Sequence, residues 1–330
     1  MAEYPVGYAV LQTKDDSRER PILMDVWYPA SEEAEEMAID YRPGSGIAAM
    51  DGEPAEGKFP LVVMSHGAFG TARSYSWIAE HLARSGYVVA GVSHFGEPFV
   101  YGPKTMDPAY ALRPWLRPQD CSFAVTFLTT QSKLKETVDS ARIGALGHSS
   151  GGATALALGG ALYDPAGMHK YCMSEDGRRD KGCDYARSGS ASSPPEPPAE
   201  ARKSCRDDRF RAIVALDPAL GPGHDEAGLS SVEVPVHIVG SVQNDFLPFD
   251  HNAGRYARLM PNAALTRLNH GEGHFVFLNE CETDISANGV PICRDRENVH
   301  RESVHEHLGK MILGFFDTHM RAPPGMPLGR

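Results

Sequence analysis

Short apolar runs alternate with longer amphipathic stretches along most of the chain, and this alternation limits the fold more than any other feature. Strands that alternate with helices pair in parallel and carry helices on both faces of the sheet. We therefore predict an α/β fold with a mostly parallel central sheet. The expected strands are 8–13, 22–28, 61–65, 88–93, 143–147, 212–216, 236–240 and 265–268, and the expected helices are 72–85, 117–130, 150–161, 252–260 and 299–319.

The N-terminal part departs from this rhythm, because no helix separates the first two strands. The polar segment TKDDSRERP joins them, and we predict an antiparallel hairpin at the edge of the sheet. The segment SGIAAMDGEPAEGK, residues 45–58, is polar and is expected to form a surface loop.

Two longer segments also interrupt the alternation. Residues 95–117 mix aromatic side chains with proline and glycine, and because long irregular loops are often functional we predict a lid or a pocket wall. Residues 163–208 form an insertion, after which the rhythm resumes, so residues 1–330 are expected to be one α/β domain. The centre of the insertion, SGSASSPPEPPAEA, has too little apolar surface to order itself, and we expect it to be mobile.

Composition limits the partners. The chain has 330 residues, 42% of them hydrophobic, and a formal net charge of −11. The acidic balance argues against nucleic acid and anionic membrane surfaces as partners, and no stretch is apolar enough for an integral membrane segment. The N-terminus lacks the pattern of a signal peptide, which indicates the cytoplasm if the chain is full length.

The placement of the six cysteines is also compatible with a location outside the cytoplasm. Cys281 and Cys293 bracket a polar loop, and Cys172, Cys183 and Cys205 lie in or beside the insertion. Such neighbours could form disulfides in the periplasm or outside the cell, and reduced surface thiols are an equal alternative. No paired C-x-x-C spacing is present, so we expect no metal site.

The segment GALGHSSGGAT joins an expected strand to an expected helix and contains the motif G-x-S-x-G. In this context the motif lifts a nucleophilic serine out of a tight bend. Glycine is expected at positions 147 and 151, because a side chain at either position would collide with the neighbouring strand or helix. Ser149 is therefore the candidate nucleophile, at a helix N-terminus that favours developing negative charge; a turn without chemistry is the alternative.

A serine hydroxyl needs a base, which in this arrangement follows both the serine and the acid along the chain. His274 lies in a glycine-containing loop just after the last expected strand, from which it could reach Ser149. His270 is a rival that lies closer to the end of the strand.

Three aspartates compete as the acid that orients the imidazole. Asp217 directly follows the strand 212–216, and Asp245 lies in the loop after 236–240. We favour Asp245, because Asp217 is also placed to cap the turn before Pro218. Asp250 is better placed to cap the following helix.

An oxyanion hole needs two backbone N–H groups. Ser150 would supply one, as the residue after the nucleophile, and Ala68 would supply the other from the loop after strand 61–65. The further candidates for the substrate pocket are Phe69, His94, Phe95, Trp115, His148 and Phe275.

The segments MSHGAFG, GHSSGGATAL, VALDPALG, VPVHIVGSVQND and GEGHFVFL, together with ERPILMDVWYPA, resemble the α/β-hydrolases called predicted dienelactone hydrolases. That group is similar to the platelet-activating-factor acetylhydrolases and, more remotely, to cutinase-like polyester hydrolases. The resemblance implies the same nucleophile, base and oxyanion donors. Dienelactone hydrolases carry a cysteine nucleophile where this chain has Ser149, so dienelactone is not expected as the substrate. The acetylhydrolase pattern implies Asp217 as the acid, whereas the cutinase-like pattern implies Asp245.

Together these features predict a serine carboxylester hydrolase that forms an acyl-enzyme with small to medium acyl or aryl esters and needs no cofactor. An amidase or acyltransferase with the same triad, a hydrolase of polyesters or phospholipids, and a non-catalytic scaffold are the alternatives. The expected partner is a small-molecule ester, and the sequence does not set the oligomeric state.

Overall fold

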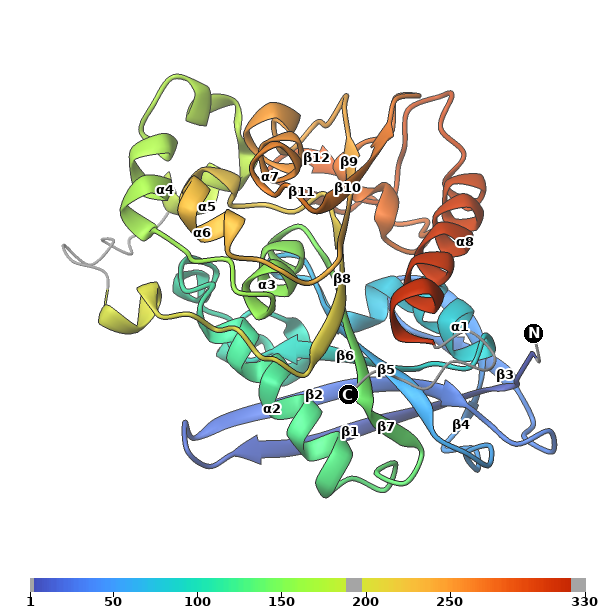
Figure 1. Cartoon of the computed structure of the whole chain (residues 1–330). Coiled ribbons are helices and arrows are strands. Elements are labelled where there is room, and N and C mark those ends of the chain that lie inside the picture. Colours follow the sequence, from blue (N-terminus) through green and yellow to red (C-terminus); the bar gives the residue numbers. More distant parts are fainter. Residues whose placement is uncertain (1–2, 188–197, 322–330) are drawn as a thin grey trace.

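The computed structural model describes residues 3–187 and 198–321, and in them strands and helices alternate as predicted (Figure 1). One mixed sheet has the strand order β10-β9-β8-β7-β5-β6-β2-β1-β4-β3, and β11 and β12 form a small separate hairpin. The strands are β1 (Val6–Asp15), β2 (Arg20–Pro29), β3 (Met37–Asp40), β4 (Ser45–Met50), β5 (Phe59–Ser65), β6 (Val88–His94), β7 (Val138–His148), β8 (Phe210–Leu216), β9 (Val236–Ser241), β10 (Ala263–Leu268), β11 (Ser286–Ala287) and β12 (Val290–Pro291). The helices are α1 (Ser76–Arg84), α2 (Leu116–Thr130), α3 (Ser150–Leu158), α4 (Pro165–Cys172), α5 (Asp184–Arg187), α6 (Glu226–Ser230), α7 (Ala253–Leu259) and α8 (Arg301–Met320).

Helices cover both faces of the sheet, which explains why its central strands are continuous apolar runs. In β5, Leu61 and Val63 pack into the cluster that α2, α3 and α7 cover. Val62 and Met64, which point the other way, pack into the cluster that α1 and α8 cover. Figure 1 shows α1 and α8 together on one side of the sheet and α2 and α3 on the other.

The N-terminal hairpin of β1 and β2 is antiparallel, as predicted, but it does not end the sheet. β4 pairs in parallel with β1 through Gly7 and Ala49, and β3 pairs with β4 as the outermost strand. The prediction of a surface loop over residues 45–58 is therefore wrong for its first part. Ala48 and Ala49 are buried in this edge, but their small side chains give a weak strand signal among polar neighbours.

The described part of the insertion forms helices. Residues 163–187 hold α4 and α5, and a disulfide joins Cys172 to Cys183. The part predicted to be mobile falls mainly on residues 188–197, which lie outside the described residues. Helix α3 ends at Leu158, before residue 161, because Gly160 takes a φ of 112°.

The tightest crossing in the fold lies where α3 leaves the sheet. A Cβ atom at Gly151 would lie 1.9 Å from the carbonyl oxygen of Ser65 in β5, and one at Gly147 would lie 2.0 Å from the carbonyl oxygen of Gly151. The atoms that a Cβ atom would meet at both positions belong to the backbone, so they cannot move aside without distorting the strand or the helix. Both glycines are thus required sterically, as the motif predicts.

We expect Gly151→Ala to lower the free energy of unfolding by at least about 1–3 kcal/mol, the usual cost of overpacking a dense interior. Gly314→Ala in α8 is the matched control, because a Cβ atom there meets nothing within 4 Å. That change should raise the free energy of unfolding by about 0.5–1 kcal/mol through better helix propensity. Urea unfolding followed by circular dichroism measures both values; equal effects would contradict the steric argument.

Candidate active site

Ser149 lies between β7 and α3 in a backbone conformation that side-chain-bearing residues rarely adopt, with φ 57° and ψ −121°. Such a conformation costs about 1–3 kcal/mol and persists only where its surroundings fix it. Here the Ser149 N–H donates to the Leu216 carbonyl at 3.0 Å, and the Ser149 carbonyl accepts the Ala219 N–H at 3.0 Å. The side chain lines a cavity of about 1270 Å³.

His274 lines the same cavity, and its imidazole ring contacts Asp217 rather than Asp245. It begins the 3-10 helix His274–Phe277, and its Nδ1 atom lies 3.3 Å from Asp217 Oδ2. The Asp217 carboxylate also accepts the Ser241 backbone N–H at 2.8 Å and the Asn244 Nδ2 group at 2.6 Å. Burial raises the pKa of the Asp217 carboxyl, and its hydrogen bonds with His274 and Ser241 oppose that rise.

These contacts fix the tautomer of the imidazole. Ser241 and Asn244 both donate N–H groups to the Asp217 carboxylate, which favours its ionised form, and an ionised carboxylate can only accept. The proton of neutral His274 therefore sits on Nδ1, facing Asp217, and Nε2 keeps its lone pair. Phe246 stacks on the ring at 5.1 Å between centroids, with 11° between the planes, which holds the ring's orientation.

The preference for Asp245 as the partner of the imidazole is not met by this geometry. Asp245 Oδ1 accepts the backbone N–H of His274 at 2.9 Å, and Oδ2 lies 3.8 Å from Arg296. The physical reason lies in the backbone at the end of β8. Asp217 takes a φ of 39° directly after the strand, which turns its buried carboxylate toward the ring. Asp245 comes later in its loop and reaches only the main chain of His274, not its ring.

The two weaker candidates lie away from this arrangement. His270 is exposed, and its backbone N–H donates to Glu272 at 2.7 Å. Asp250 is exposed, lines a separate cavity of about 260 Å³ and lies inside the 3-10 helix Phe249–His251. The helix after it begins without a side-chain cap, so the expected capping by Asp250 is not observed.

The loop after β5 lies beside the serine. A Cβ atom at Gly67 would lie only 3.4 Å from Ser149 Cβ. Ala68 and Ser150 both line the cavity, and among the described residues neither backbone N–H has a hydrogen-bond acceptor. Ser150 is the first residue of α3, where N–H groups lack intrahelical partners. Two free donors therefore border the serine, as an oxyanion hole requires.

His148 links the backbone of His274 to the loop after β5 through hydrogen bonds. Its Nε2 atom lies 2.9 Å from the His274 carbonyl, which can only accept, so Nε2 carries the proton. Its Nδ1 atom then accepts from the Tyr75 hydroxyl at 2.8 Å, and that hydroxyl accepts the Gly67 N–H at 3.1 Å. Burial and the nearby His274 hold the pKa of the His148 imidazole well below its usual range, so it stays neutral.

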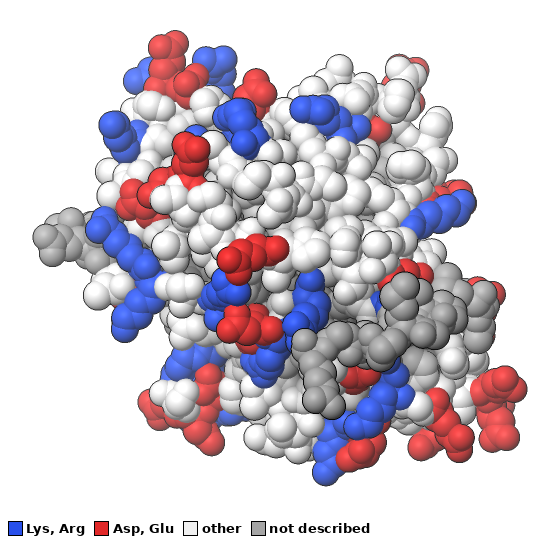
Figure 2. All heavy atoms as spheres, viewed as in Figure 1, with Lys and Arg blue, Asp and Glu red and all other residues white. Residues whose placement is uncertain are grey.

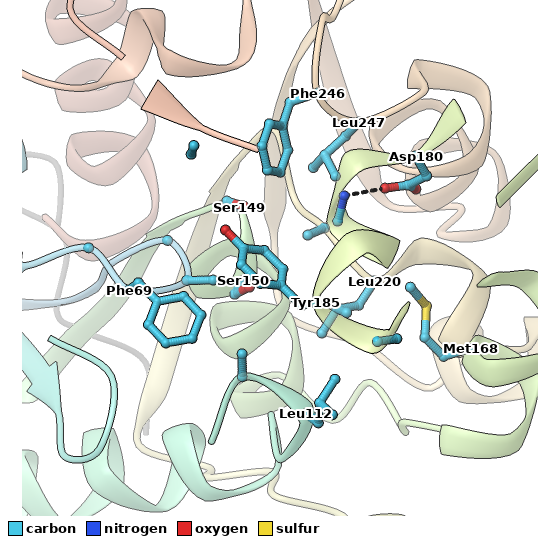
Figure 3. A pocket seen from close by; sticks show the side chains of 18 of the residues that line it. Phe69, Leu112, Ser149, Ser150, Met168, Asp180, Tyr185, Leu220, Phe246 and Leu247 are labelled. Carbon is cyan, nitrogen blue, oxygen red and sulfur yellow. Dashed lines mark hydrogen bonds between the residues drawn. The ribbon is translucent and has the colours of Figure 1, made fainter. Parts of the chain in front are cut away.

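The cavity is bordered by segments that are far apart in the sequence, and aromatic rings dominate near the serine. Figure 3 shows Phe69, Tyr185 and Phe246 around Ser149. Phe69 packs on Tyr185 at 5.4 Å between centroids. The predicted pocket residues that line the cavity are Phe69, Trp115, His148 and Phe275.

His94 and Phe95 do not line the cavity, which corrects the prediction for both. Phe95 packs against the rings of Tyr101 and Tyr110 in the loop 95–117. His94 is fully buried at the end of β6, where its ring lies between Ser65 and Asp120. Only the later part of that loop, from Ala109 to Leu116, reaches the cavity.

His94 belongs to a second arrangement of serine, histidine and aspartate. Ser65 Oγ lies 2.8 Å from His94 Nε2, and His94 Nδ1 lies 3.0 Å from Asp120 Oδ2. Asp120 is also bound by Arg20, whose Nε atom lies 2.6 Å from Oδ1. All three members are at most 3% exposed, and none of them lines the cavities of about 1270 Å³ and 260 Å³. This burial indicates that the arrangement supports the fold.

Sequence reasoning missed the insertion as a wall of the cavity. Tyr163, Met168 and Tyr185 from residues 163–187 line it, and the disulfide between Cys172 and Cys183 ties that segment together. Two features of the sequence could have indicated an ordered insertion: its two nearby cysteines and its scattered apolar residues. Both were weak evidence, because helices as short as α4 and α5 give no clear apolar periodicity.

A second disulfide, Cys281–Cys293, encloses the hairpin of β11 and β12. Ala287 and Asn288 of that hairpin also line the cavity. Asn288 Nδ2 donates to the Lys181 carbonyl at 2.9 Å, which joins the hairpin to the insertion. Four of the five loop cysteines therefore pair, as one of the two alternatives held, whereas Cys205 stays a free thiol. Each disulfide stabilises a segment at the cavity.

A metal site, a membrane-spanning helix and a strongly charged surface would each require a particular arrangement of side chains in the described residues. Residues 3–187 and 198–321 contain no group of ligating side chains that could hold a metal ion. Within the same ranges, every helix is too short or too polar to cross a bilayer. On the face seen in Figure 2, acidic and basic side chains are mixed rather than gathered by sign.

Comparison with known proteins gives a family match and a structural match. The model of a family described as platelet-activating factor acetylhydrolase, isoform II, matches residues 46–100, which include β5 and the loop after it. A search of curated proteins found no match. Among solved structures 740 chains match. One is a ferulic acid esterase from Streptomyces cinnamoneus, 20% identical, with a TM-score of 0.60 over 98% of this chain and 94% of that chain.

The protein has the α/β-hydrolase fold. The predicted fold class and the predicted resemblance to acetylhydrolases are thereby confirmed. The family model that matches residues 46–100 is described as an acetylhydrolase, and this match supports an enzyme that hydrolyses carboxylic esters.

We expect Asp217→Asn to lower kcat for a short p-nitrophenyl ester by about 10⁴-fold, because an amide at this position leaves the imidazole in the wrong tautomer. Asp245→Asn is the matched control: it weakens one hydrogen bond to the backbone of His274 and should cost at most about tenfold. Steady-state kinetics of both variants measures the difference. A larger loss in Asp245→Asn would show that the acid is Asp245.

Proposed function

We propose that the protein is a serine carboxylester hydrolase that works through an acyl-enzyme. One observation carries this proposal: Ser149 on its strained turn, the His274 imidazole and two N–H groups without acceptors all border one cavity. A nucleophile, a base with an orienting acid and an oxyanion hole are the set of groups that acyl transfer needs.

In the first half-reaction, Ser149 Oγ attacks the carbonyl carbon of the ester, and His274 Nε2 takes the hydroxyl proton. Asp217 holds the ring and stabilises the imidazolium that forms. The carbonyl oxygen becomes an oxyanion, which accepts hydrogen bonds from the Ala68 and Ser150 N–H groups. The tetrahedral intermediate then expels the alcohol, which receives the proton from His274, and the acyl group remains on Ser149.

In the second half-reaction, a water molecule gives its proton to His274 Nε2 as its oxygen attacks the acyl-enzyme. The same N–H groups stabilise the second oxyanion. Collapse of this intermediate breaks the bond between the acyl carbon and Ser149 Oγ, and the proton on His274 returns to that oxygen. The carboxylic acid leaves, and the enzyme is restored.

The lining of the cavity favours esters with an aromatic or medium-length apolar acyl group. Phe69, Tyr185 and Phe246 offer ring faces near Ser149, and such surfaces bind flat apolar groups well (Figure 3). The solved ferulic acid esterase is named for an ester of an aromatic acid, which agrees with this preference. The segments 109–116 and 163–187 would cover the bound substrate as a cap.

An amidase or acyltransferase would use the same groups, and the two differ from an esterase in leaving group and acceptor. Turnover of a matched anilide, and of an ester with added alcohol, separates these reactions from hydrolysis. Esters graded in acyl length and in aromatic content, together with a phospholipid and a polyester film, then define the substrate.

A fluorophosphonate probe tests the proposal directly, because it reacts only with an activated serine. We expect one labelled peptide, which contains Ser149, and no label on Ser65. Ser149→Ala should abolish labelling and lower ester hydrolysis to the residual level of about 10³–10⁴-fold over water that triad variants keep. Ser65→Ala, the control from the buried arrangement, should still be labelled at Ser149. An unlabelled wild-type protein, or label that persists in Ser149→Ala, would reject the assignment.

A further inference from the structure

A buried ion pair holds the loop that carries one of the two oxyanion donors. Arg117 in α2 is 2% exposed, and its Nη1 group donates to the His66 carbonyl at 2.6 Å. Its Nη2 group lies 3.5 Å from the Gly67 carbonyl. The same guanidinium binds Glu97 with two nitrogens, Nε to Oε1 at 2.8 Å and Nη2 to Oε2.

Glu97 continues the support on the other side of Ala68. It is 2% exposed, lies in the turn after β6, and its Oε2 atom accepts the Phe69 N–H at 3.2 Å. Burial alone would raise the pKa of the Glu97 carboxyl, but the Arg117 charge and its hydrogen bonds lower it. The pair is therefore ionised.

These contacts account for the polar groups of the loop around Ala68. The His66 carbonyl accepts from Arg117, whereas the Gly67 carbonyl accepts the Gly70 N–H at 3.0 Å, lies 2.7 Å from His66 Nδ1 and has Arg117 only at 3.5 Å. The Gly67 N–H binds the Tyr75 hydroxyl, and the Phe69 N–H binds Glu97. Phe69 is held at a φ of 57°, which an unsupported loop would relax. The Ala68 N–H is the donor left for a ligand in the cavity.

We propose that Arg117 and Glu97 are positioning residues that aim the Ala68 N–H at the oxyanion, so that they stabilise the transition state without contacting substrate. This inference rests on the proposed ester hydrolysis. A guanidinium is suited to the task because its planar fork serves a carboxylate and backbone carbonyls at once, which an ammonium cannot do. A contribution to folding stability does not by itself explain the pair, since desolvation offsets much of the attraction between buried charges.

Arg117→Met, Glu97→Gln and the double variant test this role. If the Ala68 N–H loses its aim, kcat should fall by up to about 10²–10³, the loss that follows removal of one oxyanion donor. KM should change much less, because the pair does not line the cavity. Glu97→Gln keeps the volume and one acceptor oxygen, so it should fold and show a smaller loss in kcat.

Inhibitor binding separates positioning from general damage. A trifluoromethyl ketone adds to the serine and forms an oxyanion, whereas the matched methyl ketone binds mainly without addition. We expect the variants to bind the trifluoromethyl ketone more weakly in parallel with their loss in kcat/KM, and to bind the methyl ketone as the wild type does. Arg301→Met is the control, because Arg301 is also a buried arginine, 5% exposed against 2% for Arg117, and pairs with Asp295 outside the oxyanion loop.

The inference is overturned if folded variants keep wild-type kcat, or if both ketones lose affinity equally. It is also overturned if Arg301→Met shows the same selective loss, because the effect would then follow stability. Thermal unfolding verifies that each variant is folded. A wild-type protein that neither hydrolyses esters nor reacts with fluorophosphonate removes the proposed function and this inference together, whereas an active wild type with unaffected variants removes the inference alone.

Discussion

The backbone contact between α3 and β5 is the constraint on which the rest of the site depends. Gly151 meets the carbonyl of Ser65 so closely that no side chain fits between them. The same helix start holds Ser149 in its strained conformation, and the same strand runs directly into the loop of Ala68. One contact therefore sets the proposed nucleophile and a proposed oxyanion donor at a fixed separation, and any side chain that spreads the two elements would move both.

The remaining groups reach this point because parallel strands end at one edge of the sheet, where α/β proteins gather their sites. β8 brings Asp217, the loop after β9 brings Asn244, and the loop after β10 brings His274. Asp245 supports the same arrangement through the main chain of His274. The loop after β9 thus contributes to the candidate site by holding His274 and Asp217, the proposed base and acid, in place.

The protein contains two sets of serine, histidine and aspartate, and the residue types alone do not tell which set could act on a substrate. Ser65, His94 and Asp120 have hydrogen-bond lengths that would suit a triad, yet they are enclosed, and Arg20 neutralises the aspartate. Ser149 differs because its turn faces a cavity. Access to substrate separates the two sets, and it follows from packing around them.

The sequence by itself determined the α/β architecture and the strained turn at Ser149, because apolar periodicity and glycine spacing are local properties that neighbouring residues impose. It also brought His274 and Ala68 into consideration through their positions after strands. Only the tertiary structure placed Asp217 rather than Asp245 against the imidazole, because both aspartates lie at the same sheet edge and a positive φ turns one of them inward. It alone turned the insertion into a wall of the cavity and buried His94, since contacts between distant segments decide which side chains face a ligand.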